Sequence, residues 1–180
     1  MIYYFAYGSN LHPMRLMGRV ASATLIGTIK LTRYKLIFHK KSIDGSSKCN
    51  LLETGEPSDH VYGAIYELDP QDKNDLDQFE GKGAGYIDTP IQFQLEGVTY
   101  DCFTYIAQQS HIVNHLKPYH WYKDLVIIGA KFLQFPEAYV LSIESIESWD
   151  DPNKDRTLEK ESFLKTIMMA DECVSDLSKI

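Results

Sequence analysis

The chain has 180 residues, of which 44% are hydrophobic and 24% are charged, so it is long enough to bury a core and has the composition of a globular protein. Its net charge of −7 argues against a nucleic-acid-binding surface, and no apolar run approaches the roughly 20 residues of a membrane-spanning helix. Three widely spaced cysteines and the lack of a visible secretory signal favour a cytoplasmic protein.

The first 107 residues predict mainly strands. Six short segments are rich in β-branched and aromatic residues, namely 2–7, 34–39, 49–53, 61–68, 87–95 and 98–106. Glu96 and Gly97 predict a tight hairpin turn between the last two. Two helices interrupt the strands: one over 12–18, and one that is capped by Asp69, begins at Pro70 and runs to about Glu80.

The rest of the chain predicts helices over 118–133, 136–148 and 155–177, the last with an amphipathic pattern. Strands followed by helices indicate an α+β fold, and many short antiparallel strands with few helices to cover them favour a small β-barrel flanked by helices. We therefore expect a single domain over residues 1–180, with a C-terminal helical extension over about 150–180.

The first predicted strand breaks off at Gly8-Ser9-Asn10. Glycine can take a positive φ, so Gly8 allows a sharp turn whose successive backbone N–H groups form a cradle for an anion. The short helix that follows would add its positive end nearby. The alternative is a plain turn capped by the side chain of Ser9 or Asn10, and the local sequence leaves both open.

Glu80 ends the second predicted helix, where the helix dipole disfavours a carboxylate. Gly81, Gly83 and Gly85 follow it and permit backbone conformations that few other residues adopt. An acidic helix precedes these glycines, which is the wrong context for a dinucleotide-binding motif. A glutamate in an apolar, flexible pocket is suited to proton transfer, and the alternative is a solvated residue at a helix end.

Four stretches occur in the order "YFAYGSNL", "VYGAIYEL", "LDQFEGKGAGY" and "YKDLVIIGAKFLQFPEAYV", and together they resemble the γ-glutamylcyclotransferase (AIG2-like) family over about residues 3–140. The resemblance implies a small β-barrel flanked by helices, with no cofactor and no metal. It also implies that Glu80 is the catalytic acid/base. The implied substrate-binding residues are Tyr7, Gly8, Ser9, Asn10, Leu11 and Tyr86, and for Tyr86 simple packing in the barrel is the alternative.

The activity implied by the resemblance is conversion of a γ-glutamyl-amino acid or γ-glutamyl-amine to 5-oxoproline and the free amine. The α-amine attacks the γ-carbonyl of the same molecule, so holding one conformer supplies much of the acceleration. The alternative is a non-catalytic ligand-binding or interaction module on the same barrel, which would have no need of Glu80 beside an intact loop. The implied partner is a small γ-glutamyl molecule, and the sequence leaves a homodimer open.

Selection of the leaving half is expected from the 42–48 loop and from an aromatic cluster of Tyr119, Trp121 and Tyr122. Because the protein is acidic, we expect γ-glutamyl-alanine to be a better substrate than glutathione, unless nearby lysines lie at the mouth of the site. These lysines are Lys40, Lys41 and Lys48, for which plain solvent exposure is the alternative.

Overall fold

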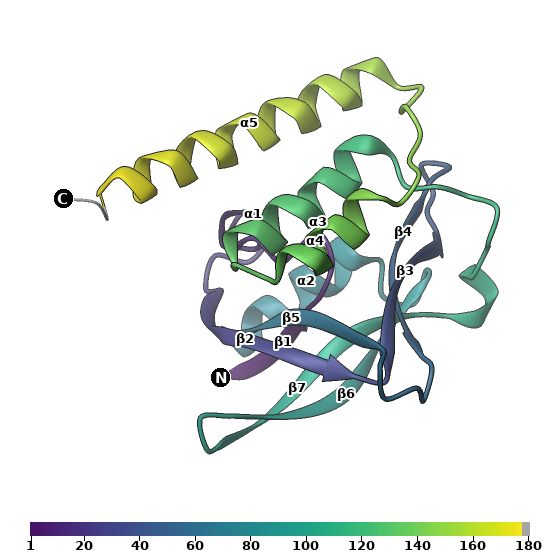
Figure 1. The fold of residues 1–180 in the computed structure, drawn as a ribbon. Coiled ribbons are helices and arrows are strands. Elements are labelled where there is room, and N and C mark those ends of the chain that lie inside the picture. Colours follow the sequence, from purple (N-terminus) through teal and green to yellow (C-terminus); the bar gives the residue numbers. More distant parts are fainter. Residues whose placement is uncertain (178–180) are drawn as a thin grey trace.

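The computed structural model describes the backbone of residues 1–177 and the side chains of residues 1–173, and it consists of a curled sheet, a separate hairpin and a layer of helices (Figure 1). The strands are β1 (Ile2–Ala6), β2 (Thr24–Thr32), β3 (Tyr34–Lys41), β4 (Ser47–Glu53), β5 (His60–Leu68), β6 (Tyr86–Leu95) and β7 (Val98–Ala107). The α-helices are α1 (Pro13–Met17), α2 (Lys73–Glu80), α3 (His120–Phe132), α4 (Glu137–Glu144) and α5 (Lys154–Leu177).

The main sheet has five strands in the order β2-β5-β1-β7-β6, so the first strand of the chain lies in the middle. β1 pairs antiparallel with β5 and parallel with β7. Both faces of its second half are covered, and Phe5 and Ala6 have no exposed surface. The position of this strand decides where the loop after it lies.

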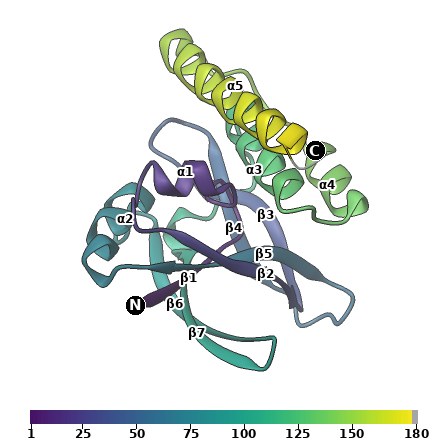
Figure 2. The ribbon, with the colours of Figure 1, turned by 90° about the vertical axis from the view of Figure 1, so that its left-hand side faces the viewer.

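The α+β class is confirmed, but the expected barrel is an open, curled sheet with β2 and β6 as its edges (Figure 2). The two edges approach each other through side chains. An added Cβ at Gly27 on β2 would lie only 2.7 Å from Cδ2 of Leu95 on β6. The strands β3 and β4 form their own two-stranded sheet, which contacts β5 and β7.

Each of the six predicted strands is present, with ends that move by no more than a few residues. The turn between β6 and β7 is also confirmed, because Glu96 and Gly97 both have positive φ values of 51° and 81°. The sequence analysis missed β2. Gly27 interrupts its pattern and marks an irregularity in its pairing with β5 between Leu25 and Gly27, as glycine in a strand often does.

The helices α3, α4 and α5 lie together on one side of the molecule, with α5 on the outer side of α3, and α2 lies apart from them in Figure 2 (Figures 1 and 2). Before α2, Asp69 accepts a hydrogen bond from the N–H of Gln71 at 2.9 Å and so caps a 3₁₀ turn over Pro70–Asp72, as its position before a proline predicts. No helix within residues 1–177 is both long and apolar enough to cross a membrane.

A buried carboxylate fixes the start of α5. The side chain of Asp151 accepts hydrogen bonds from Nε and Nη2 of Arg156 at 2.5 and 2.6 Å. It also accepts from Nε1 of Trp121 on α3 and from the backbone N–H of Asn153, both at 2.9 Å. Two donors therefore reach each carboxylate oxygen, and the start of the last helix is joined to α3.

Candidate active site

The loop that follows β1 is a β-turn. The N–H of Leu11 donates to the carbonyl of Gly8 at 3.0 Å and closes the turn over Ser9 and Asn10. From β5, the hydroxyl of Tyr66 donates to the carbonyl of Leu11 at 2.6 Å. The backbone N–H groups of Ser9 and Asn10 have no acceptor within the described part of the chain. These two groups are the ones that a backbone cradle requires.

Glycine is needed at position 8 for a different reason from the one predicted. Gly8 is absent from the glycines with positive φ, so the turn does not depend on a left-handed conformation there. An added Cβ would lie 3.1 Å from Cβ and 3.4 Å from Sγ of Cys49 on β4. The glycine therefore allows a close approach between the turn and β4.

Leu11 and α3 meet at a second glycine. The side chain of Leu11 is fully buried, and an added Cβ at Gly129 would lie only 2.5 Å from its Cβ. This contact gives a structural reason for the glycine at position 129, which lies in the fourth of the stretches quoted from the sequence. It also places Leu11 as a packing anchor of the turn, and its contact with a substrate stays a prediction.

Glu80 is the last residue of α2, as predicted. Gly81 continues the chain with a left-handed conformation at φ 65°, and Gly83 and Gly85 have φ values of 83° and 136°. The expectation that these glycines adopt conformations unfavourable for other residues is confirmed. Through them the chain reverses direction, and β6 begins at Tyr86.

The turn and Glu80 are in direct contact although they are 70 positions apart in the sequence. The side-chain amide of Asn10 donates to Oε1 of Glu80 at 2.9 Å. Nη1 of Arg19 donates to the same oxygen at 2.5 Å and to Oδ1 of Asn10 at 2.9 Å. Oε2 of Glu80 receives no hydrogen bond from the described residues.

A small cavity separates the turn from the aromatic wall of the site. Its volume of about 20 Å³ has room for about one water molecule, so a larger ligand requires the walls to move apart. The lining residues come from the loop after β1, from α2, α3 and β4, and from three strands of the main sheet: Tyr4, Tyr7, Gly8, Ser9, Asn10, Cys49, Glu80, Tyr86, Tyr105 and Tyr122.

The two tyrosines predicted for the site are held by backbone carbonyls. The hydroxyl of Tyr7 donates to the carbonyl of Tyr105, and the hydroxyl of Tyr86 donates to the carbonyl of Cys49 at 2.5 Å. Burial raises the pKa of both tyrosines well above the usual value, so both hydroxyls stay protonated. Tyr86 thus packs in the wall with its hydroxyl turned to β4, and its role toward a substrate or Glu80 stays a prediction.

The structure adds one residue that the sequence analysis missed. Arg19 supplies the positive charge beside Glu80, and both side chains are mostly buried, with 18% and 16% of their surface exposed. The site around the glutamate is therefore more polar than the apolar pocket expected from sequence. In the sequence, the hint is that Arg19 follows Asn10 by only nine positions in a chain of net negative charge. This hint is weak, because charged residues usually point to solvent.

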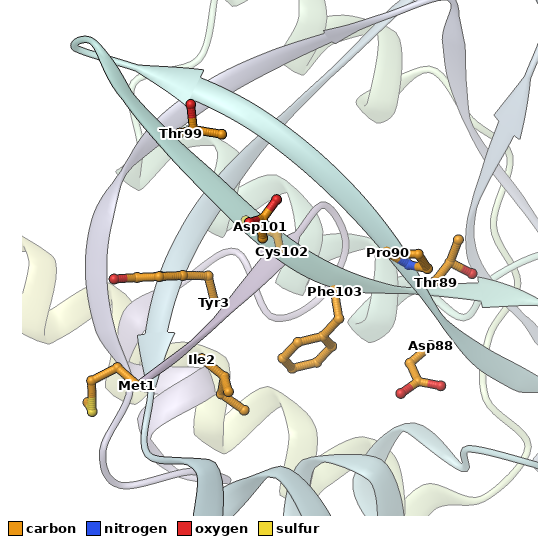
Figure 3. A pocket seen from close by; sticks show the side chains of 10 residues that line it. All are labelled: Met1, Ile2, Tyr3, Asp88, Thr89, Pro90, Thr99, Asp101, Cys102 and Phe103. Atoms are coloured by element: carbon orange, nitrogen blue, oxygen red, sulfur yellow. The ribbon is translucent and has the colours of Figure 1, made fainter.

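A wider hollow of about 610 Å³ lies elsewhere, along the start of β1 and the strands β6 and β7 (Figure 3). Tyr3, Phe103 and Asp88 are among its lining residues, and none of the predicted site residues belongs to it. Among the described residues, no group of three His, Cys, Asp or Glu side chains is arranged to hold a metal ion. All of the predicted site residues except Leu11 line the small cavity beside Glu80.

A turn with unpartnered backbone N–H groups and a carboxylate in contact with it, both beside a cavity lined by tyrosines, is a candidate site for a small polar molecule. A sequence profile described as "Gamma-glutamyl cyclotransferase, AIG2-like" matches residues 4–124, which is more than half of the chain. The chain therefore belongs to the γ-glutamylcyclotransferase, AIG2-like family.

Individual relatives agree with this assignment. The chain is 29% identical to a γ-glutamylcyclotransferase of Homo sapiens over 163 residues, and 30% identical to one of Bos taurus over 159 residues. Each match covers 84% of this chain and 81% of the relative. A solved structure described as "Gamma-glutamyl cyclotransferase" superposes with a TM-score of 0.75 at 27% identity, covering 92% of this chain and 98% of that one.

Proposed function

We propose that this chain converts γ-glutamyl-amino acids to 5-oxoproline and the free amino acid, with Glu80 as acid/base. The observation that carries the proposal is the contact between Glu80 and Asn10, which brings a carboxylate to the turn with unpartnered N–H groups. The names of the relatives support the same reaction type. The reaction needs no external nucleophile, because the substrate carries its own amine.

The ring closure moves two protons. The attacking nitrogen starts as an ammonium with three protons and ends as a lactam N–H with one. The departing nitrogen starts as an amide N–H and ends as an ammonium, so it gains the two protons that the attacking nitrogen loses. Glu80 takes protons from the attacking nitrogen and returns them to the departing one, and its Oε2, which has no donor among the described residues, is the oxygen available for this transfer.

The turn has a separate task. When the amine attacks, the γ-carbonyl oxygen becomes an oxyanion, and the new C–N bond forms before the old one breaks. The N–H groups of Ser9 and Asn10, which have no acceptor among the described residues, would stabilise that charge or hold the substrate carboxylate. Arg19 and the side chain of Asn10 act on Oε1 of Glu80 and hold the carboxylate in position.

The direct test is to incubate the purified protein with γ-glutamyl-alanine and to measure 5-oxoproline by mass spectrometry against a sample without protein. We expect equal amounts of 5-oxoproline and alanine. The matched control is N-acetyl-γ-glutamyl-alanine, which lacks the nucleophilic amine and should give no product. Release of glutamate in place of 5-oxoproline would indicate hydrolysis, and binding without any product would favour the non-catalytic module.

A further inference from the structure

Lys40 on β3 is a largely buried cation whose ammonium lies over the ring of Tyr86 and has no carboxylate partner among the described residues. Only 7% of the residue is exposed, and its ammonium forms neither a hydrogen bond nor an ion pair with any described residue. Arg19 and Lys48, by contrast, are paired with carboxylates, Arg19 with Glu80 at 2.5 Å and Lys48 with Asp44 at 2.7 Å. A buried charge is costly unless something compensates it, and the ring of Tyr86 supplies part of that compensation, so a lysine without a carboxylate partner at this place requires an explanation.

The ammonium lies against the wall of the site. It is 4.6 Å from the ring centre of Tyr86, which lines the cavity beside Glu80. Gly85 makes room for it, because an added Cβ there would lie 2.6 Å from Cε and 2.8 Å from Nζ of Lys40. Gly85 therefore combines a strained turn after Glu80 with space for this lysine.

The charge balance around Lys40 favours an incoming anion. Burial lowers the pKa of Lys40, and the carboxylates of Glu80 and Asp44 act against that shift. Those two carboxylates already have Arg19 and Lys48 as partners. A third carboxylate brought to this wall would be repelled by them, and Lys40 is a cation at this wall, beside Tyr86, without a carboxylate partner among the described residues.

We infer that Lys40 binds the α-carboxylate of the leaving amino acid and so selects γ-glutamyl-amino acids over γ-glutamyl-amines. The inference rests on the proposed function. In such a substrate the carboxylate is attached to the carbon next to the departing nitrogen, which must lie within proton-transfer reach of Glu80. In glutathione the corresponding carboxyl is an amide, so this contact also favours γ-glutamyl-alanine over glutathione.

The test compares two substrates that share the γ-glutamyl half. γ-Glutamyl-alanine carries the leaving carboxylate, and γ-glutamyl-ethylamide lacks it. In Lys40→Met the side chain keeps its length and loses its charge, and we expect kcat/KM for γ-glutamyl-alanine to fall by about tenfold to a hundredfold, the range for a hydrogen bond to a charged group. For γ-glutamyl-ethylamide we expect kcat/KM to change by less than about twofold, because its leaving half has no carboxylate for Lys40 to bind.

The matched control is Lys41→Met, which removes the same charge from the neighbouring exposed residue and should leave both substrates unaffected. An equal loss on both substrates in Lys40→Met would overturn the inference, since it would assign Lys40 to the γ-glutamyl half or to the fold. No loss on either substrate would overturn it as well.

A binding measurement separates this inference from the proposed function. Calorimetric titration of both compounds into Glu80→Gln, with and without Lys40→Met, reports affinity without turnover. Loss of affinity for γ-glutamyl-alanine alone supports the role of Lys40 even if the wild-type protein forms no 5-oxoproline. Equal affinities before and after the Lys40 change, or no binding of either compound, would refute it.

Discussion

Asp151 and Glu80 are carboxylates that each accept a hydrogen bond from an arginine. They differ in how many of their oxygens remain without a donor. Asp151 is buried with two hydrogen-bond donors on each oxygen, from Arg156, Trp121 and the backbone of Asn153. Glu80 receives both of its hydrogen bonds on Oε1. The first carboxylate is saturated, and the second has one oxygen, Oε2, without a hydrogen-bond donor among the described residues.

This difference indicates a structural role for Asp151 and agrees with the proton-transfer role proposed for Glu80. A fully hydrogen-bonded buried carboxylate resists protonation, and the donors around Asp151, Arg156 first among them, lower its pKa to about 2. Such a group can join elements but cannot exchange protons near neutral pH. Glu80 joins the turn to α2 through Oε1, and in the proposed reaction Oε2 carries the protons.

The largest effect is expected from Glu80→Gln. The amide can still accept a hydrogen bond from Arg19, but it can no longer carry a proton between the two nitrogens. We expect kcat to fall by at least the ~100-fold typical of a lost general acid/base, while the thermal midpoint changes little. The measurement is 5-oxoproline formation from γ-glutamyl-alanine together with a melting curve. Near-normal turnover would remove Glu80 from the mechanism.

Asp151→Asn should show the reverse pattern. We expect the free energy of unfolding to drop by about 2 kcal/mol, because charge-assisted hydrogen bonds from Arg156 are lost. We expect kcat/KM to stay within about twofold of the wild type. Urea denaturation and the same kinetic assay measure both. A large loss of activity in a stable variant would show that the two carboxylates are not functionally distinct.

The stability contribution of Asp151 should also depend on pH. Its folded-state pKa of about 2 lies below the usual aspartate value, so the contribution is complete above the unfolded-state pKa of about 3.9 and disappears as the pH falls through about 2. The difference in unfolding free energy between wild type and Asp151→Asn should therefore be constant above about pH 5 and shrink in acid. A difference independent of pH would contradict this.

Arg19→Met should have a smaller effect, confined to the site. Arg19 positions Glu80 and Asn10, so its loss should lower kcat by about tenfold with a smaller change in KM. Arg19→Lys restores the charge and should recover part of the loss. If Arg19→Met changed only the melting temperature, Arg19 would have a purely structural role like that of Arg156. The proposed functional difference between the Glu80 and Asp151 sites would then be wrong.

The smallest effect is expected from Ser9→Ala. The hydroxyl of Ser9 forms no hydrogen bond within the residues that the structure describes, and the backbone N–H is kept in alanine. We expect kcat/KM within about threefold of the wild type. A variant as inactive as Glu80→Gln would assign the hydroxyl a direct role, including that of a nucleophile.

The sequence predicted the parts of the site that depend on local chemistry. The turn after β1 and the glycines after Glu80 are present where expected, although Gly8 does not have the positive φ from which the turn was predicted. The close approach of Cys49 to Gly8 depends on how β4 packs, and no local pattern reports it. The same holds for Arg19, whose partner is 61 positions away in the sequence.

In the fold, too, features set by local sequence were predictable, and features set by contacts between distant residues were not. The six strands with dense β-branched or aromatic residues were predictable, and β2 was not, because Gly27 is explained only by its contact with Leu95 on the opposite edge. Closure of the sheet also depends on distant pairing. A tendency of short strands to curl does not decide whether the edge strands β2 and β6 form hydrogen bonds.

The central place of β1 has a consequence for the dynamics of the site. A strand that is hydrogen-bonded on both sides and buried exchanges its amide hydrogens mainly through global unfolding. The turn begins two residues after this strand, so its conformational entropy is lost when the protein folds, before any ligand arrives. Less of the binding free energy is then offset by ordering of the turn, and more is available to hold the substrate in the reactive conformer.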